Sequence, residues 1–329
     1  MLVAPGLKLA GNRQGGPQVH TPGVALETTI VPRRPYSLAL SARMKSDATR
    51  YFRHGVLTLA LSSESEPAVG RVAQAPDGSL SVRIDGRRPR EALETLRFVL
   101  AADDDHAPFL ERFRDDPVLG SRVRRLAGLR PLRVATVSHA LLKAVCGQLI
   151  QSRAARLLEA RLLRLAAPAH EDLRLPPDRT TFAGYAPAEL VRHGLAARKA
   201  GVLVRISREW DLERLRAVHS DAAATRIERE RGLGPWSAGM ICLYGLGRFD
   251  RGLVGDLGLI KLCSSLRGRR ADVDDTRELL APYGEWSGLA SVYLLSGGFS
   301  SPAQRRADNS SGIAGPRRHT PRGPRRRMR

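Results

Sequence analysis

The 329-residue chain is long enough for two or three domains with a substantial core. Its 54 Lys and Arg outnumber 33 acidic residues, and the net charge of +21 predicts a polyanionic partner, most simply nucleic acid. A high-GC genome that favours Arg and Ala is the alternative explanation. No apolar run of membrane-spanning length and no signal-peptide pattern is present, so we expect a cytoplasmic, nucleoid-associated protein without a membrane partner.

The N-terminal third is predicted to hold a short disordered segment and a small mixed domain. Residues 1–24 are rich in Gly, Pro and polar residues and lack periodicity, so we expect disorder. Residues 25–105 show β-type alternation and then helical spacing, which predicts an α+β domain. The expected strands are Glu27–Val31, Gly55–Leu61, Ala68–Gln74 and Leu80–Ile84, a turn covers Ala75–Ser79, and a helix covers Arg90–Ala101.

Residues 106–297 change to helical periodicity throughout. The expected helices are Pro108–Phe113, Pro117–Leu126, Ser138–Leu165, Pro187–His193, Arg198–Arg208, Leu212–His219, Ala222–Arg229, Leu257–Leu266, Asp275–Ala281 and Trp286–Leu295. Residues 298–329 form an Arg-, Pro- and Gly-rich tail with a net charge of +8, predicted to be disordered. The tail either adds salt-sensitive DNA affinity or is a solvated extension without a role.

The sequence predicts no metal site and no cofactor. Cys146, Cys242 and Cys263 are scattered and lack the clustering of a zinc site, an iron–sulfur cluster or a disulfide framework. We interpret them as buried structural thiols. The histidines show no ligand spacing either.

A Gly-rich turn, Gly232-Leu233-Gly234, separates two expected helices. Glycine permits positive φ angles and close approach of a ligand, and the N–H groups at the start of the helix near Pro235 are suited to phosphate. Leu233 would pin the turn between the helices. On these three residues alone, an ordinary αα-hairpin is the alternative.

Asp256 follows a second Gly-rich loop and opens the expected helix Leu257–Leu266. We interpret Asp256 as a catalytic carboxylate. A helix N-cap is the structural alternative, and the two roles are compatible.

The longer segments Gly232–Gly239 (GLGPWSAG) and Arg251–Leu259 (RGLVGDLGL) resemble the signature of the HhH-GPD base-excision DNA glycosylases, closest to the DNA-3-methyladenine glycosylase II group. Residues 144–150, 194–200 and 286–294 resemble further family segments in the same order, so the resemblance covers about residues 25–301. Two places depart from the family pattern. Glu230-Arg231 stands where the family usually has Leu-Pro, and Val254-Gly255 replaces a Pro-containing loop.

The resemblance implies a TBP-like α+β domain over residues 25–105 and an all-α helix-hairpin-helix glycosylase body over residues 106–297. It also implies a monomeric, monofunctional enzyme that flips alkylated bases of the 3-methyladenine type out of damaged double-stranded DNA and hydrolyses the N-glycosidic bond. Trp236 stands where bifunctional relatives carry a Lys, so no lyase activity is expected. The alternatives are a catalytically impaired DNA-binding protein and a glycosylase for an oxidised base.

The resemblance also gives candidate site residues. Asp256 is the expected catalytic carboxylate. DNA contacts are expected from the hairpin and from a wedge in the loop before the long helix: Gly232, Leu233, Gly234, Trp236, Ser237 and Leu132. The expected base pocket contains Gln148, Tyr244 and Trp286, because aromatic faces bind a cationic base. For Leu132, Gln148 and each aromatic residue, packing in the core is the alternative.

Overall fold

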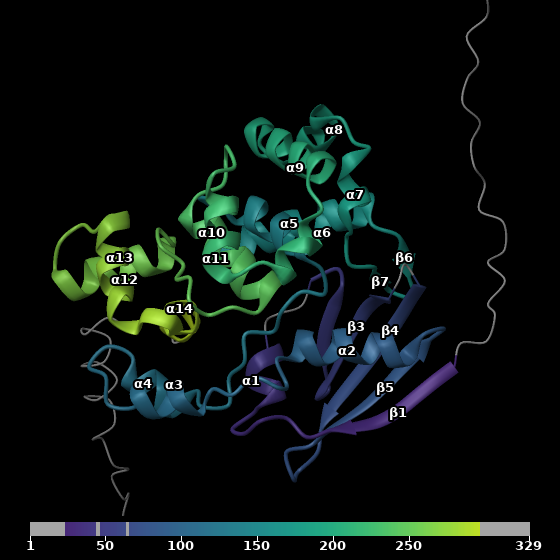
Figure 1. Ribbon diagram of the computed structural model, residues 1–329, viewed down its shortest axis with the longest axis horizontal. Helices are drawn as coiled ribbons and strands as arrows, with labels where there is room; N and C mark the ends of the chain where they lie inside the picture. Colours follow the sequence, from purple (N-terminus) through teal and green to yellow (C-terminus); the bar gives the residue numbers. More distant parts are fainter. Residues whose placement is uncertain (1–23, 44–46, 64–65, 297–329) are drawn as a thin grey trace, which may run out of the picture.

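The computed structural model of the chain describes residues 24–43, 47–63 and 66–296. The predictions of disorder fall on 1–24 and 298–329, which lie outside these ranges except for Val24, the first residue of a strand. Three hydrophobic cores organise the described part: one under a sheet and two among helices (Figure 1).

The first core lies between an antiparallel sheet and one helix. The strands follow the order β1-β5-β4-β3-β2, and helix α2 packs on one face. Leu80, Val82 and Ile84 of β5 are buried, whereas Ser81 and Arg83 between them are exposed, which is the alternation that selects a strand. The bounds are β1 (Val24–Ile30), α1 (Leu38–Ala42), β2 (Arg50–Arg53), β3 (Val56–Ser63), β4 (Glu66–Gln74), β5 (Leu80–Gly86) and α2 (Pro89–Leu100).

The second core surrounds helix α5, which is buried along nearly its whole length. Its N-terminus is satisfied by Thr136, whose hydroxyl accepts from the His139 N–H at 3.1 Å. The elements of this part are α5 (Val137–Gly147), α6 (Ser152–Ala166), β6 (Ala169–His170), β7 (Leu173–Arg174), α7 (Arg179–Ala183), α8 (Pro187–Arg192), α9 (Ala197–Glu209), a 3₁₀ segment (Leu212–Ala217), α10 (Ser220–Glu228) and α11 (Pro235–Ile241), which continues as a π-helical turn (Cys242–Leu246).

The third core joins segments far apart in sequence. Two helices that follow the sheet, α3 and α4, pack against the last three helices of the described chain, as Figure 1 shows beside α14. The bounds are α3 (Ala107–Arg112), α4 (Gly120–Arg125), α12 (Leu257–Arg267), α13 (Val273–Leu280), a 3₁₀ segment (Ala281–Trp286) and α14 (Ser287–Leu295). Asp256, at the start of α12, lies beside α11, because Trp236 of α11 donates a hydrogen bond to it.

The expected fold class, a small sheet followed by helices, is confirmed in this coarse form. The single helix expected over Ser138–Leu165 is wrong, because the chain breaks between α5 and α6. Leu149 in this break has φ +57°, a conformation outside any right-handed helix. Within the described ranges, no helix combines the length and apolar character needed to cross a membrane.

Candidate active site

The hairpin between α10 and α11 has a backbone that only glycine suits. Gly232 has φ +98°, and a Cβ there would lie 2.4 Å from a methyl group of Val202. Leu233 is 7% exposed and packs in the second core, as a plug between the helices would. The Gln148 side-chain amide donates to the Gly232 carbonyl at 2.8 Å and to the Ser237 hydroxyl at 3.1 Å. The hairpin is therefore fixed to the end of α5.

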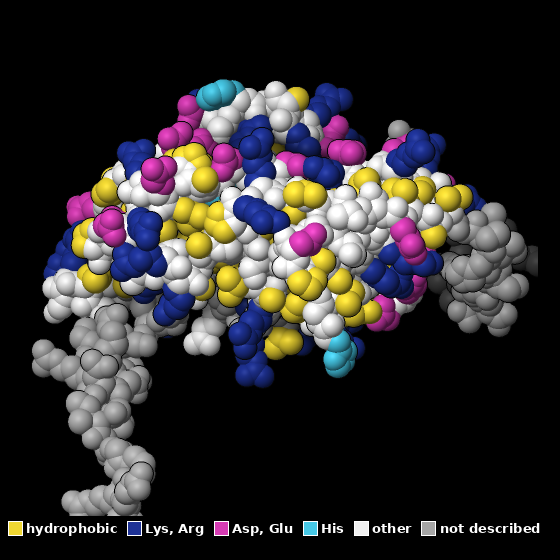
Figure 2. All heavy atoms as spheres, turned by 90° about the horizontal axis from the view of Figure 1, so that it is seen from below, with side chains coloured by type: hydrophobic (Ala, Val, Ile, Leu, Met, Phe, Trp, Pro, Cys, Tyr) yellow, Lys and Arg dark blue, Asp and Glu magenta, His cyan; other side chains and the backbone are white. Residues whose placement is uncertain are grey.

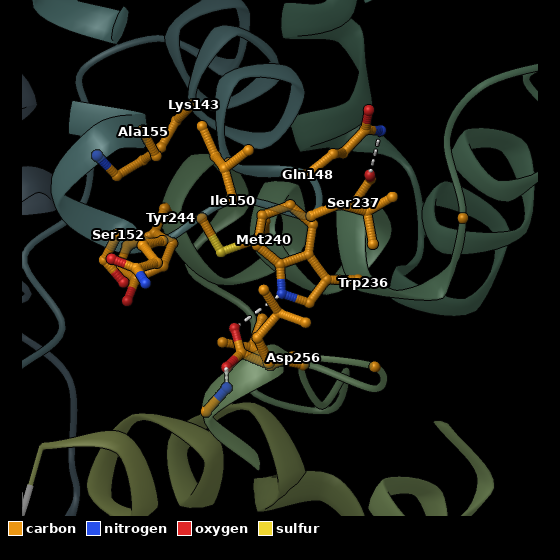
Figure 3. Close-up of a pocket in the computed structure, with 18 of the residues that line it drawn as sticks. Lys143, Gln148, Ile150, Ser152, Ala155, Trp236, Ser237, Met240, Tyr244 and Asp256 are labelled. Carbon is orange, nitrogen blue, oxygen red and sulfur yellow. Dashed lines mark hydrogen bonds between the residues drawn. The ribbon is translucent and has the colours of Figure 1, made fainter. Parts of the chain in front are cut away.

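Asp256 is the N-cap of α12, and both of its carboxylate oxygens accept hydrogen bonds. One oxygen accepts from the Gly258 backbone N–H at 2.7 Å, and the other accepts from the Trp236 indole N–H at 3.0 Å. The structural role and the proposed chemical role thus coexist in one side chain. Figure 3 shows the carboxylate held between these two donors.

A cavity of about 1120 Å³ lies next to this carboxylate. Its lining includes the apolar and aromatic side chains of Ile150, Trp236, Met240 and Tyr244 together with Asp256 (Figure 3). Burial, followed by the negative charge of Asp256, raises the pKa of Tyr244 to about 12, so its phenol stays protonated. The cavity is large enough for a nucleobase and carries one carboxylate at its edge.

Trp236 forms a wall of the cavity. A Cβ on Gly147 would lie 2.6 Å from the far edge of the indole, so the ring occupies the space that glycine leaves. The opposite edge of the indole donates to Asp256. Trp236 was expected to contact DNA; its ring is used here to orient the carboxylate.

Three other expected site residues have side chains that pack against neighbouring groups of the protein. Trp286 stacks on Phe249, with ring centroids 6.1 Å apart; it is partly buried against the third core and is absent from the described lining of the cavity. Leu132 borders the cavity, but it is 1% exposed and packs under the sheet, so its side chain does not project as a wedge. Ser237 is 2% exposed, and its hydroxyl accepts from Gln148. Gln148 and Tyr244 do line the cavity, and their contact with a base stays a prediction.

Leu149 is a candidate site residue that the sequence interpretation missed. Its side chain is 85% exposed, the largest exposed fraction among the large hydrophobic residues described, and it borders the cavity from the break between α5 and α6. A positive φ costs free energy for a residue with a Cβ, and nothing in the described chain packs on this side chain to offset that cost. Gly147-Gln148 inside the expected helix was the available signal for this break.

The two departures from the family pattern are compensated locally. Glu230 is paired with Arg205 of α9, so its charge does not stand alone beside the hairpin. The loop before Asp256 is tied to the third core by two hydrogen bonds. The Gly255 N–H donates to the Thr276 hydroxyl at 2.8 Å, and the Leu253 N–H donates to the Ser291 hydroxyl at 3.0 Å.

Basic side chains border the cavity on several elements: Arg156 on α6, Arg198 and Lys199 on α9, and Lys261 on α12. Burial lowers the pKa of Lys199, whose ammonium donates to the Gln148 carbonyl at 2.7 Å. On the face in Figure 2, Lys and Arg lie in separate groups with Asp and Glu among them. The face in Figure 2 has no continuous basic patch, so the basic groups that border the cavity are better candidates for phosphate contacts than the Lys and Arg on that face.

One cluster has donor types that metals use. Asp47, His139 and Glu159 have ligand atoms within 4.8 Å of one another. Lys143 already pairs with Glu159 at 3.1 Å, and Arg50 pairs with Asp47 at 3.3 Å. These two cations compensate both carboxylates, so we propose no metal at this cluster.

Comparison with known proteins agrees with this geometry. A search of protein-family models gives no match. DNA-3-methyladenine glycosylase of Bacillus subtilis (strain 168) is 28% identical over 204 residues, which cover 58% of this chain and 67% of that protein. The solved 3-methyladenine DNA-glycosylase from Archaeoglobus fulgidus superposes with a TM-score of 0.68 at 20% identity, covering 82% of this chain and 97% of that one.

A second solved structure has the same fold and a different stated substrate. The Clostridium acetobutylicum 8-oxoguanine glycosylase/lyase, in complex with duplex DNA, gives a TM-score of 0.65 at 16% identity and covers 83% of this chain and 93% of that one. The shared fold and the relative agree with each other: the chain has the fold of these DNA glycosylases and is similar in sequence to a DNA-3-methyladenine glycosylase over 58% of its length.

Proposed function

We propose that this protein is a monofunctional DNA glycosylase that flips a damaged base out of duplex DNA and hydrolyses its N-glycosidic bond. The observation that carries the proposal is the Asp256 carboxylate at the edge of a base-sized cavity, oriented by the Trp236 indole and by the cap of α12. The relative named a DNA-3-methyladenine glycosylase supports an alkylated purine as the substrate.

Asp256 supplies the chemistry. As the bond between the sugar C1′ and the base nitrogen breaks, its electron pair leaves with the base and positive charge develops on the sugar. The carboxylate stabilises that charge and orients the water that forms the new C1′–O bond, whose proton passes to the carboxylate. An alkylated purine is already cationic and leaves as a neutral base, so one carboxylate is sufficient.

DNA binding in this proposal uses the hairpin and the cavity rim. The N–H groups of Gly232 and Gly234 and of Trp236 and Ser237 in the first turn of α11 bind a phosphate, and the basic groups around the cavity add salt-sensitive affinity. Leu149 enters the stack where the flipped base leaves a gap, the role first expected of Leu132. The partner is damaged double-stranded DNA, bound by a monomer without a cofactor.

Lyase activity is not part of the proposal. Trp236 provides no amine at the position of the lyase Lys. The two lysines of the inner cavity wall are already engaged: Lys143 donates to Glu159, and Lys199 donates to the Gln148 carbonyl. An assay for strand cleavage at an abasic site tests this, and a covalent protein–DNA adduct formed when borohydride reduces a Schiff base would show that a cavity amine acts as a nucleophile.

Substitution of Asp256 by Asn tests the central claim. Asn is about as good an N-cap as Asp, so α12 should keep its start and the protein should fold. We expect Asp256→Asn to abolish the release of methylated bases from duplex DNA and to leave DNA affinity unchanged. Unimpaired release would remove Asp256 from the mechanism. If the native protein binds duplex DNA but releases no base, the alternative of a catalytically impaired DNA-binding protein is correct.

A further inference from the structure

Two buried hydroxyl groups hold the loop that ends at Asp256. The Gly255 N–H donates to the Thr276 hydroxyl of α13 at 2.8 Å, and the Leu253 N–H donates to the Ser291 hydroxyl of α14 at 3.0 Å. Thr276 and Ser291 are both 0% exposed, so bulk water does not compete with either hydroxyl. The loop therefore depends on two helices of the third core for these backbone hydrogen bonds.

Each hydroxyl is arranged to accept from the loop. Thr276 donates its proton to the Val273 carbonyl at 2.6 Å, and Ser291 donates its proton to the Ser287 carbonyl at 2.7 Å. A hydroxyl has a single proton, so only its lone pairs remain for the loop N–H groups. One such bond from Ser or Thr back to its own helix is an ordinary structural feature. Here two helices direct the same arrangement at one short loop, the loop that ends at the carboxylate.

The loop has little room to absorb a displacement. A Cβ on Gly239 of α11 would lie 2.6 Å from the Gly252 carbonyl oxygen, so helix backbone meets loop backbone without a side chain between them. The Asp256 N–H donates to the Leu253 carbonyl at 3.0 Å, which connects Asp256 to the segment that Ser291 holds. A shift of the loop is therefore passed on to the carboxylate.

We propose that Thr276 and Ser291 are positioning residues of base release, and that their hydroxyls fix the loop so that the Asp256 carboxylate faces the sugar. This inference rests on the proposed glycosylase function. Thr276 has the larger effect, because it holds Gly255, which is bonded directly to Asp256 and has φ +85°. The Trp236 indole restrains the carboxylate of Asp256, and the two hydroxyls restrain its backbone.

The central test replaces the Thr276 hydroxyl by a methyl group. Thr276→Val keeps the shape of the side chain but leaves the buried Gly255 N–H without its acceptor, so the loop must move to satisfy it. We expect single-turnover release of methylated bases from duplex DNA by the full chain to slow by about 100-fold, the effect of a misplacement of about 1 Å. Thr276→Ser keeps the hydroxyl and should keep most of the native rate.

Ser41 provides a matched control for the second hydroxyl. Ser41 of α1 is also 0% exposed; its hydroxyl donates to the Ser37 carbonyl at 2.7 Å and accepts from the Arg130 N–H at 2.8 Å. Ser291→Ala and Ser41→Ala thus remove the same kind of hydroxyl, one at the loop of Asp256 and one in α1. Both should lower the Tm by a similar amount. Only Ser291→Ala should slow base release, by a smaller factor than Thr276→Val.

Binding of two abasic-site analogues separates positioning from DNA affinity. A pyrrolidine nucleotide in a duplex carries positive charge where the sugar of the transition state does, whereas a tetrahydrofuran nucleotide is neutral. The native protein should bind the pyrrolidine duplex more tightly, because Asp256 faces that charge. Thr276→Val should lose most of this preference and keep the native affinity for the tetrahydrofuran duplex, a result that a loss of stability alone would not produce.

The results that overturn the inference differ from those that overturn the proposed function. Native rates and a native preference for the pyrrolidine duplex in both Thr276→Val and Ser291→Ala reject the positioning role and leave the proposed function intact. Equal slowing by Ser41→Ala means that the hydroxyls act only through stability. If Thr276→Val does not fold, Ser291→Ala measured against Ser41→Ala decides the question. A native protein that releases no methylated base and binds the two duplexes equally rejects the proposed function and the inference with it.

Discussion

Gly147→Ala should disable catalysis without changing Asp256, the proposed catalytic carboxylate. The new Cβ would lie 2.6 Å from the edge of the Trp236 ring, whereas carbon atoms in contact normally lie about 3.5–4.0 Å apart. The indole must therefore shift by about 1 Å, and the 3.0 Å hydrogen bond that its opposite edge donates to Asp256 cannot keep both its length and its angle, so the carboxylate is displaced. A misplacement of about 1 Å can cost about 100-fold in rate.

The stability effect is smaller than the effect on the rate. Crowding a packed site costs about 1–3 kcal/mol, while replacing a helical Gly by Ala recovers roughly 0.5–1 kcal/mol. We expect a net loss of no more than about 2 kcal/mol, measured as the free energy of unfolding in urea. Gly201→Ala in α9 is the matched control, since a Cβ there meets no atom within 4 Å. It should keep the native rate and gain slightly in stability.

A double variant isolates the steric cause. Trp236→Phe removes the ring atoms that the added Cβ would overlap and also removes the indole N–H. Gly147→Ala with Trp236→Phe should therefore regain stability but keep the low rate, and the two single losses of rate should not add. Single-turnover base release and urea unfolding measure both quantities. A native rate in Gly147→Ala would refute the role of Trp236 as the positioning residue of Asp256.

Two further predictions concern the cavity rim and its buried charge. Leu149→Ala should slow base release from duplex DNA by ~10-fold or more, because Leu149 replaces the stacking lost when the base flips, and it should leave release from single-stranded DNA unchanged. The control is Leu157→Ala, which changes an exposed Leu on α6 outside the cavity lining and should alter neither rate. Because the pKa of Glu159 is lowered to about 2 in the folded chain, its stabilising contribution is present above pH 4.5 and is lost as the pH falls toward 2. The Tm of the native protein should fall between pH 5 and 3 more steeply than that of Glu159→Gln, and parallel curves would contradict the charged buried pair.

Local patterns were sufficient for much of the fold. The strand over residues 80–86 and the helix over residues 89–100 follow from alternation and from an apolar stripe, because each element buries one face against its neighbour. The short strand β2 (Arg50–Arg53) was missed. Its residues alternate weakly, and pairing with β3 rather than local propensity holds it in the sheet.

The site divides in the same way. Asp256 and the glycines of the hairpin could be identified because their chemistry depends on local spacing along the chain. Trp286 could not be placed, because an aromatic residue on a helix fits a cavity or a core equally well until the packing is known. Here Trp286 packs on Phe249 and Phe109, with ring centroids 6.1 and 5.9 Å away, at the third core.

The break between α5 and α6 shows why the remaining part was out of reach. Gln148 donates to the Gly232 carbonyl, 84 residues away in sequence, and its own carbonyl accepts from Lys199, 51 residues away. These contacts cannot form if the helix continues through Gln148, so tertiary structure overrides a helical pattern that is locally sound. The same interruption leaves Gly147 against the Trp236 ring and turns Leu149 outward at the rim. Gly147, Gln148 and Leu149 thus link the orientation of Asp256, the hairpin and the proposed wedge. A substitution at any one of these residues should alter the positions of the other two.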